Sequence, residues 1–390
     1  MCTRDHMMCM VVHMAPLLDA IDPSTVDDLH RRLNHTRAAR LPSGNGWERG
    51  TDPVALAALL RRWRREFDPA AFERRVRALP WAQAGPLRVL HQPATPSSPS
   101  TGDAPTVVLL HGWPDSVLRY ERVLPLLRDV TVVVPALPGF PFAADDAARD
   151  RTTVATIAAD VGAALRALGY ERYVVSGGDI GADIAEHLAT IEPDRVAALH
   201  LTNISPLHAV TADPTELDDE GLEYLGVVGR WARTEGAYIA LQSTRPHTLA
   251  AGLADSPAGL AAWLLEKLHG WTDVPFDDDD LLTWISAYWF TTAIGTSFAT
   301  YTEPVAPAPY VATPTMLSTF AHDTKPAPRG FASRFVNVQA HAEHDQGGHF
   351  AAWEVPEVFV ADLRTAIDLG FPAGATRPAP DRPTGAHRHR

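Results

Sequence analysis

The stretch "YVVSGGDIGAD", Tyr173–Asp183, decides how the chain is interpreted. Its first three residues are β-branched or aromatic and predict a buried strand. Small residues and Asp179 follow, and then "ADIAEHLATI", which predicts a helix. An ionisable side chain on so tight a strand-to-helix turn has two explanations. It is a helix N-cap, a position that Asp suits well, or it is a nucleophile.

The residues around Asp179 match the second explanation. The sequence "GGDIG", residues 177–181, has the small-x-nucleophile-x-small form of a nucleophile elbow, where small neighbours permit a sharp turn. The usual elbow residue is Ser. A carboxylate in its place forms an ester with an alkyl carbon, so it suits the opening of a C–O or C–halogen bond. The pattern by itself leaves the N-cap explanation open.

Composition limits the class of protein. The chain has 390 residues, which predicts two to three structural units at about 150 residues per domain. A net charge of −13 argues against a nucleic-acid partner. The only cysteines, Cys2 and Cys9, offer neither a disulfide framework nor a nucleophile. We expect no cofactor and no metal, and we interpret the acidic run Asp277–Asp280 as a solvated loop that caps the next helix.

Two apolar stretches are candidates for membrane segments. The N-terminal "MCTRDHMMCMVVHM" is too short to span a bilayer and lacks a signal-peptide cleavage pattern. The stretch Leu281–Tyr301 has no charge over 21 residues, but it contains five threonines and two serines. A lipid-facing helix is more uniformly apolar, so we predict buried helices in a soluble, cytoplasmic protein.

Strands alternate with helices from residue 106. "TVVLLHGWP" predicts a strand that ends in a turn, and "VTVVVPALPGF", "YVV" and "RVAALHLTN" predict further strands. "SVLRYERVLPLLRD" and "VATIAADVGAALRALGY" predict helices between them. This alternation predicts a mostly parallel, doubly wound sheet. Helical patterns with several tryptophans then run from 208 to about 303. Strand patterns return at "PTMLSTFAHD" and "FVNVQAHAEHDQGGHF", before a closing helix.

The region before the sheet is predicted to be helical, with "STVDDLHRRLNHTR" opening on a Ser/Thr cap signal. We therefore divide the chain into segments. They are a disordered extension (1–14), an N-terminal helical meander (15–103), the first part of the α/β core (104–207), an inserted helical cap (208–304), the second part of the core (305–372) and a disordered tail (373–390).

The sequence "HGWP", residues 111–114, follows the strand pattern at 106–110. In hydrolases with a nucleophile elbow, the loop at this place donates one backbone N–H to the oxyanion hole, and the residue after the nucleophile donates the other. Those residues are Trp113 and Ile180. We also expect Trp113, Pro114 and Ile180 to line the substrate pocket. His111 is more simply explained as a residue that orients the loop.

A general base should follow the nucleophile in chain order. Of the 17 histidines, His349 is the best candidate, because "DQGGHFAAWEVPE" places it after two glycines and before a helix. His341 and His344 are not excluded by residue type. Most single histidines are surface or packing residues, so each needs structural support.

The acid that orients the base is harder to choose. Asp323, in "STFAHDTKP", lies on a loop just after a predicted strand, where such an acid belongs. Asp345 is close in sequence to His349 and is a poorer choice. Glu303 is weaker still.

Taken together, these motifs resemble the microsomal-type epoxide hydrolases and their soluble bacterial and fungal relatives. The matching stretches are "VDDLHRRLNHTR…GWERG" at the start, "HGWP", "GGD-x-G" and "GGHFAAWE-x-PE" in the core, and "YIALQSTRPHTLAAGLADSPAGLAAWLLEK" in the cap. They extend over nearly the whole chain. The resemblance implies the α/β-hydrolase fold and hydrolysis of an epoxide to a vicinal diol, with water as the second reactant.

The resemblance also implies residue roles. Asp179 falls at the family's nucleophile, His349 at its base and Asp323 at its acid. Tyr238, before "IALQSTRP", and Tyr301, in "SFATYTE", fall at two cap tyrosines that act on the epoxide oxygen. The alternative for each tyrosine is core packing with its hydroxyl hydrogen-bonded.

One position departs from the family pattern. The family commonly has Trp after the nucleophile, where this chain has Ile180. This argues against a haloalkane dehalogenase, which holds its halide with such a Trp, although that rival stays open together with a non-catalytic ligand-binding member. The Ala-, Arg- and Pro-rich composition is typical of a high-GC bacterium. Detoxification and a biosynthetic role both remain open, as does a homodimer.

Overall fold

The computed structural model describes residues 18, 20–42, 44, 46–95, 104–144, 152–303 and 306–372. The predicted extension at 1–14, with both cysteines, and the predicted tail at 373–390 lie outside the described residues. Within the described part, no helix is long and apolar enough to cross a membrane.

An eight-stranded sheet forms the core, in the order β1-β2-β4-β3-β5-β6-β7-β8. The last six strands of this order run parallel, and β2 pairs antiparallel with both β1 and β4. The strands are β1 (Trp81–Ala84), β2 (Leu87–Gln92), β3 (Thr106–Leu110), β4 (Thr131–Pro135), β5 (Tyr173–Gly177), β6 (Val196–Leu201), β7 (Val311–His322) and β8 (Val336–Gly348). The chain thus has the expected α/β-hydrolase fold.

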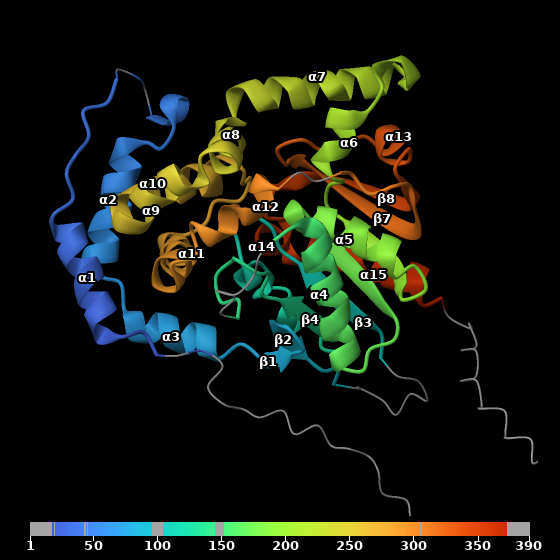
Figure 1. Ribbon diagram of the computed structural model, residues 1–390, viewed down its shortest axis with the longest axis horizontal. Helices are drawn as coiled ribbons and strands as arrows, with labels where there is room; N and C mark the ends of the chain where they lie inside the picture. Colours follow the sequence, from blue (N-terminus) through green and yellow to red (C-terminus); the bar gives the residue numbers. More distant parts are fainter. Residues whose placement is uncertain are drawn as a thin grey trace, which may run out of the picture.

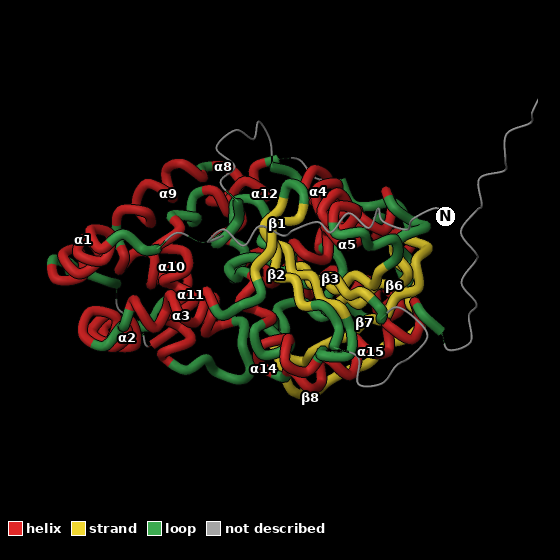
Figure 2. Tube along the Cα trace, turned by 90° about the horizontal axis from the view of Figure 1, so that it is seen from below, coloured by secondary structure: helices red, strands yellow, loops and turns green. Residues whose placement is uncertain are grey.

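Helices cover both faces of the sheet. Figure 2 shows α4 and α5 on one side of the strands and α15 on the other. Because both faces are covered, β3, β4, β5 and β6 are buried along their whole length and their apolar runs are continuous. The helices of the core are α4 (Val154–Ala167), α5 (Ile180–Ile191), α13 (Arg329–Ala332), α14 (Ala351–Glu354) and α15 (Pro356–Gly370).

A helical insertion separates β6 from β7. It comprises α6 (Pro206–Thr211), η4 (Pro214–Glu216), α7 (Asp219–Thr234), α8 (Ala237–Thr244), α9 (Pro246–Asp255), α10 (Pro257–Gly270), α11 (Asp278–Thr291), η5 (Thr296–Phe298) and α12 (Ala299–Thr302). The uncharged stretch at 281–301 lies within it, and most of α11 is buried, as predicted.

The N-terminal helices pack against this insertion rather than standing apart. Figure 1 shows α1, α2 and α3, in blue, beside α9, α10 and α11. Arg75 joins three regions, with ion pairs to Glu121 at 2.9 Å and to Asp280 at 2.8 Å. The N-terminal elements are α1 (Pro23–Asn34), η1 (Gly46–Arg49), α2 (Pro53–Arg65) and α3 (Pro69–Arg77).

Three local predictions were wrong. The N-cap of α1 is Asp22 rather than Ser or Thr, because Pro23 occupies the first helical position, where its lack of an N–H leaves no donor without an acceptor. The segment after residue 116 forms only the short 3₁₀ turns η2 (Val117–Tyr120) and η3 (Leu124–Leu126). In the acidic run, Asp277 caps α11 as expected, but Asp280 is buried, because it pairs with arginines from two other regions.

Candidate active site

The predicted site residues meet at one edge of the sheet. Trp113, Asp179, Asp323 and His349 follow the carboxyl ends of β3, β5, β7 and β8. Ligands of open α/β sheets bind outside these carboxyl ends, where the connecting loops converge. The parallel order of the strands therefore brings together side chains that are up to 236 residues apart in the sequence.

Asp179 occupies a strained elbow between β5 and α5. Its backbone has φ 55° and ψ −133°. It holds the N-cap position of α5, but its side chain accepts no hydrogen bond from an N–H of that helix, so helix capping does not explain the carboxylate. Its carboxylate instead accepts a hydrogen bond from the Trp113 N–H at 2.9 Å. Its own N–H donates to Asn203 Oδ1 at 2.8 Å. Both bonds fix the direction of the carboxylate.

Two glycines permit this close approach. A Cβ atom on Gly112 would lie 2.4 Å from Asp179 Oδ1, and one on Gly181 would lie 2.2 Å from the carbonyl oxygen of Leu110. Only glycine fits at either place. The small residues of the elbow are thus required by the packing of α5 against the end of β3.

His349 and Asp323 form a hydrogen-bonded pair beside the elbow. His349 Nδ1 lies 2.8 Å from Asp323 Oδ1, which also accepts the Thr324 N–H at 2.6 Å. Burial opposes ionisation of Asp323, but the neighbouring His349 and Lys325 outweigh it and lower its pKa. An ionised acceptor at Nδ1 keeps the proton there and leaves Nε2 as the basic atom.

His349 Nε2 faces the elbow. It lies 3.6 Å from Asp179 Oδ2, which is too far for a hydrogen bond, and it is buried without a partner among the described residues. The backbone of His349 is held on both sides. Its N–H donates to Trp271 O at 2.8 Å, and its carbonyl accepts from Arg119 at 2.5 Å.

Tyr238 of α8 and Tyr301 of α12 lie over the same edge. Their rings meet edge to face at 6.2 Å, and the Tyr238 ring stacks on Trp113 at 5.1 Å. Burial raises the pKa of both phenols well above its ordinary value, and the nearby Asp179 raises it further. Both hydroxyls therefore remain proton donors at neutral pH. The predicted pocket residues Pro114 and Ile180 are buried.

The alternative candidates lie elsewhere. His344 Nε2 pairs with Asp362 at 2.7 Å, and His341 Nε2 contacts Thr319 Oγ1 at 3.2 Å. His111 is fully buried behind the loop, where its Nε2 accepts the Leu137 N–H at 3.3 Å, so it is a structural residue. His349 Nδ1 donates its hydrogen bond to Asp323, in preference to the other candidate acids Asp345 and Glu303.

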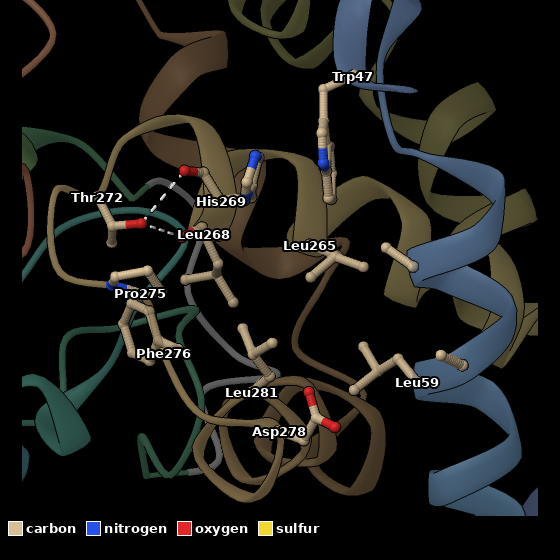
Figure 3. Close-up of a pocket in the computed structure, with 12 residues that line it drawn as sticks. Trp47, Leu59, Leu265, Leu268, His269, Thr272, Pro275, Phe276, Asp278 and Leu281 are labelled. Carbon is tan, nitrogen blue, oxygen red and sulfur yellow. Dashed lines mark hydrogen bonds between the residues drawn. The ribbon is translucent and has the colours of Figure 1, made fainter. Parts of the chain in front are cut away.

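A hollow of about 180 Å³ lies between α2, α10 and α11. Figure 3 shows the residues that line it. Its lining is mostly apolar, with Leu59, Leu265 and Phe276 among its residues, and Trp47 stacks on His269 at its rim at 3.8 Å. It contains none of the predicted site residues. The hollow belongs to the junction between the N-terminal helices and the insertion. It is separate from the candidate catalytic residues at the carboxyl ends of the strands. In the described part of the chain, no cluster of acidic, His or Cys side chains suits a metal ion.

Sequence reasoning missed four residues at this edge. Asn203 lies two residues after β6, at the end of the predicted strand "RVAALHLTN", so its place at the carboxyl end of a strand was a usable signal. Lys325 follows Asp323 on the same loop. Asp183 lies one helical turn after Asp179, and Glu354 belongs to the motif around His349. Nothing in the sequence showed that the last three point inward.

Two family models match the chain, and known proteins are similar to it over most of its length. A model of the alpha/beta hydrolase fold matches residues 105–246, and a model described as "Epoxide hydrolase N terminus" matches residues 15–120. A Stigmatella aurantiaca protein named "Putative epoxide hydrolase" is 32% identical, over 90% of this chain and 84% of the relative. Epoxide hydrolase 1 of Sus scrofa is 27% identical, over 88% and 86%.

Solved structures give the same result. Epoxide hydrolase from Aspergillus niger superposes with a TM-score of 0.79 at 27% identity, over 90% of this chain and 95% of that one. Juvenile hormone epoxide hydrolase from Bombyx mori gives 0.78 at 28% identity, over 90% and 92%. The fold and the site thus define an enzyme of the α/β-hydrolase class. Within that class, the chain belongs to the epoxide hydrolase family.

Proposed function

We propose that the protein hydrolyses an epoxide to a vicinal diol through a covalent ester on Asp179. One observation carries the proposal: the elbow presents a carboxylate, hydrogen-bonded to the Trp113 N–H, between the basic atom of His349 and two buried phenols. A carboxylate nucleophile forms an ester with an alkyl carbon. The phenols supply the proton that the opening ring requires.

In the first step, an oxygen of Asp179 attacks a ring carbon and the C–O bond of the epoxide breaks. Tyr238 or Tyr301 donates its proton to the leaving oxygen, and the other phenol donates a hydrogen bond. Because burial keeps both phenols protonated, the leaving group departs as an alcohol instead of an alkoxide. The product is a hydroxyalkyl ester on Asp179.

In the second step, His349 Nε2 removes a proton from water, and the hydroxide attacks the ester carbonyl of Asp179. Asp323 stabilises the imidazolium that forms. The Trp113 N–H and the N–H of Ile180, which lies in the first turn of α5 and has no partner within that helix, hold the oxyanion. Each such donor contributes about 3 kcal/mol to the barrier reduction in hydrolases. The diol leaves when the ester bond breaks, which restores the Asp179 carboxylate, and the proton on His349 returns through solvent to the phenolate that the first step left.

We also propose that residues 208–304 act as a cap on the core, with the segment 15–103 packed against both. The support is that both phenols come from the insertion, whereas the nucleophile, base and acid come from the core. A cap that closes over the sheet edge excludes water from the ring-opening step.

A single turnover in heavy-oxygen water tests the covalent route. We expect the first diol to take its oxygen from Asp179, so the label should appear in the protein. Asp179→Asn should abolish turnover, and His349→Gln should trap the ester. Label that enters the diol directly on the first turnover would refute the mechanism.

The remaining candidates predict different results. A haloalkane dehalogenase would release halide from a haloalkane panel, which we do not expect, because Ile180 cannot hold a halide through an indole N–H. A ligand-binding member would bind epoxides without turnover, and it would not form the ester in His349→Gln.

A further inference from the structure

The chain has only two lysines, Lys267 and Lys325, whereas lysine and arginine together number 34. Both lysines lie where the insertion meets the core. Lys267 is buried and forms an ion pair with Glu266 at 2.8 Å. Lys325, two residues after Asp323, forms no ion pair with any carboxylate in the part of the chain that the structure describes. Its partners are neutral.

The surroundings of Lys325 belong to the active site. Its Nζ lies 3.8 Å from the centre of the Trp231 ring on α7 and donates to Thr324 Oγ1 at 3.1 Å. Trp231 in turn meets the Tyr238 ring at 6.1 Å. Burial lowers the pKa of Lys325, and the nearby Asp323, Asp179 and Asp183 oppose this effect. A cation enclosed in this way without an anionic partner is costly.

Asp183 provides a second polar group close to the nucleophile, and one of its two carboxyl oxygens has no partner among the described residues. It lies in the first turn of α5, its Oδ1 is buried without a hydrogen-bond partner among the described residues, and no ion pair joins it to Lys325. Burial raises the pKa of Asp183 to about 8. Among its neighbours, Glu186 and Asp179 raise this pKa and Lys325 and the Ser205 hydroxyl lower it. At neutral pH the carboxyl is therefore protonated and can donate a hydrogen bond.

We propose that Lys325 and Asp183 form a subsite for a carboxylate of the substrate, so that the preferred epoxide is an epoxy acid whose carboxylate lies a few bonds from the ring. This inference rests on the proposed function. Lys325, two residues after Asp323, and Asp183, one helical turn after Asp179, each keep hydrogen-bonding capacity that their partners in the described part of the chain do not use, which suits an anion that accepts from both. Lys325 also offsets the repulsion between the substrate carboxylate and Asp179. The pair thus determines specificity without taking part in bond breaking.

The test compares two series of terminal epoxides. In one series, zero to three methylene groups separate the ring from a carboxylate. In the other, a methyl group replaces the carboxylate. We expect at least one acid to exceed its alkane counterpart in kcat/KM by about 10- to 100-fold, the range that a charge-assisted hydrogen bond supplies. Lys325→Met should remove this ratio by lowering kcat/KM for the acid.

Lys267→Met is the matched control, because it removes the chain's other lysine, which already has a carboxylate partner. It should leave the acid-to-alkane ratio unchanged. The ratio should also fall as pH rises through about 8, where Asp183 ionises. In Asp183→Asn this fall should be absent, because the amide donates a hydrogen bond at every pH.

The outcomes separate the two proposals. A wild-type enzyme that hydrolyses neither series contradicts the proposed function. Equal efficiency toward acids and alkanes contradicts the subsite alone. If Lys325→Met lowers both series equally, Lys325 has only a structural role and the inference is overturned.

A binding measurement keeps the proposal testable if Lys325→Met fails to fold. Reductive methylation with ¹³C labels gives two lysine resonances beside that of the chain's amino terminus, and the positive charges are retained. Titration with the diol acid formed from the best substrate should shift the Lys325 resonance and leave that of Lys267 in place. An unmoved Lys325 resonance at saturation would contradict the subsite.

Discussion

Glu354 holds the loop of His349 in place, which gives a sharp prediction for Glu354→Gln. The buried carboxylate accepts four backbone hydrogen bonds. Its Oε1 accepts the Phe350 N–H at 3.0 Å, and its Oε2 accepts those of Gly348 at 3.1 Å, Asp273 at 2.7 Å and Val274 at 3.0 Å. The donors flank His349 and reach into the loop between α10 and α11.

The magnitude follows from the acceptor oxygen that Gln lacks. The charge itself is not the source, because burial raises the pKa of Glu354 in spite of the four N–H groups, so the fold favours a neutral side chain. Gln has one acceptor oxygen in place of two, so the Phe350 N–H loses its partner in a buried place, which costs about 1–3 kcal/mol. We expect the free energy of unfolding to fall by about 2 kcal/mol.

The effect on catalysis is separate from the effect on stability. A Gln amide can keep its oxygen at the Oε2 position, but it then turns its NH₂ toward the Phe350 N–H, next to His349. A displacement of about 1 Å at a reacting group can cost about 100-fold in rate. We therefore expect slower hydrolysis of the ester with little change in its formation, so that ester accumulates during turnover.

Urea unfolding and rapid-quench kinetics measure the two effects. Glu357→Gln is the control, because Glu357 is exposed in the first turn of α15 and should change neither quantity. If Glu354→Gln is less stable but hydrolyses the ester at the wild-type rate, Glu354 does not position His349. The reasoning then fails.

Three further predictions follow from the same contacts. Arg119→Met leaves the fully buried Asp115 without its partner at 2.6 Å and should lower the free energy of unfolding by about 3–5 kcal/mol, measured with urea; an unchanged midpoint would contradict it. Burial raises the pKa of Asp183 in the folded state to about 8, so between about pH 4 and pH 8 the folded chain holds a proton that the unfolded chain releases. Asp183 therefore lowers the free energy of unfolding progressively as pH rises through this window. Asp183→Asn should therefore raise Tm by an amount that grows over this window, and a constant difference would refute the assignment. Tyr238→Phe and Tyr301→Phe should each slow ester formation by about 10- to 100-fold and leave ester hydrolysis unchanged. Single-turnover kinetics measure both steps, and equal slowing of the two would contradict the prediction.

Local sequence determined the elements and the identity of several site residues. The apolar runs of β3 to β6 can only be buried on both faces, and the glycines around Asp179 permit only a tight turn. Residue type and order then indicated His349 and Asp323, because each follows a strand pattern. The sequence was misleading where neighbouring residues could each fill the same position. At the start of α1, Ser24, Thr25 and Asp22 can all cap a helix, and Asp22 is the cap because Pro23 takes the first helical position.

The tertiary structure decided the rest, because its causes lie far apart in the sequence. Whether Asp179 caps α5 depended on the Trp113 N–H, 66 residues away, which takes its carboxylate. The buried position of Asp280 depended on arginines from two other segments. Lys325 and Asp183 look like ordinary surface residues in the sequence, and only the packing of α7 and α5 encloses them beside the nucleophile. The sequence by itself therefore determined which chemistry is available, and the packing decided which charges are left without partners, since burial and pairing are properties of the folded chain alone.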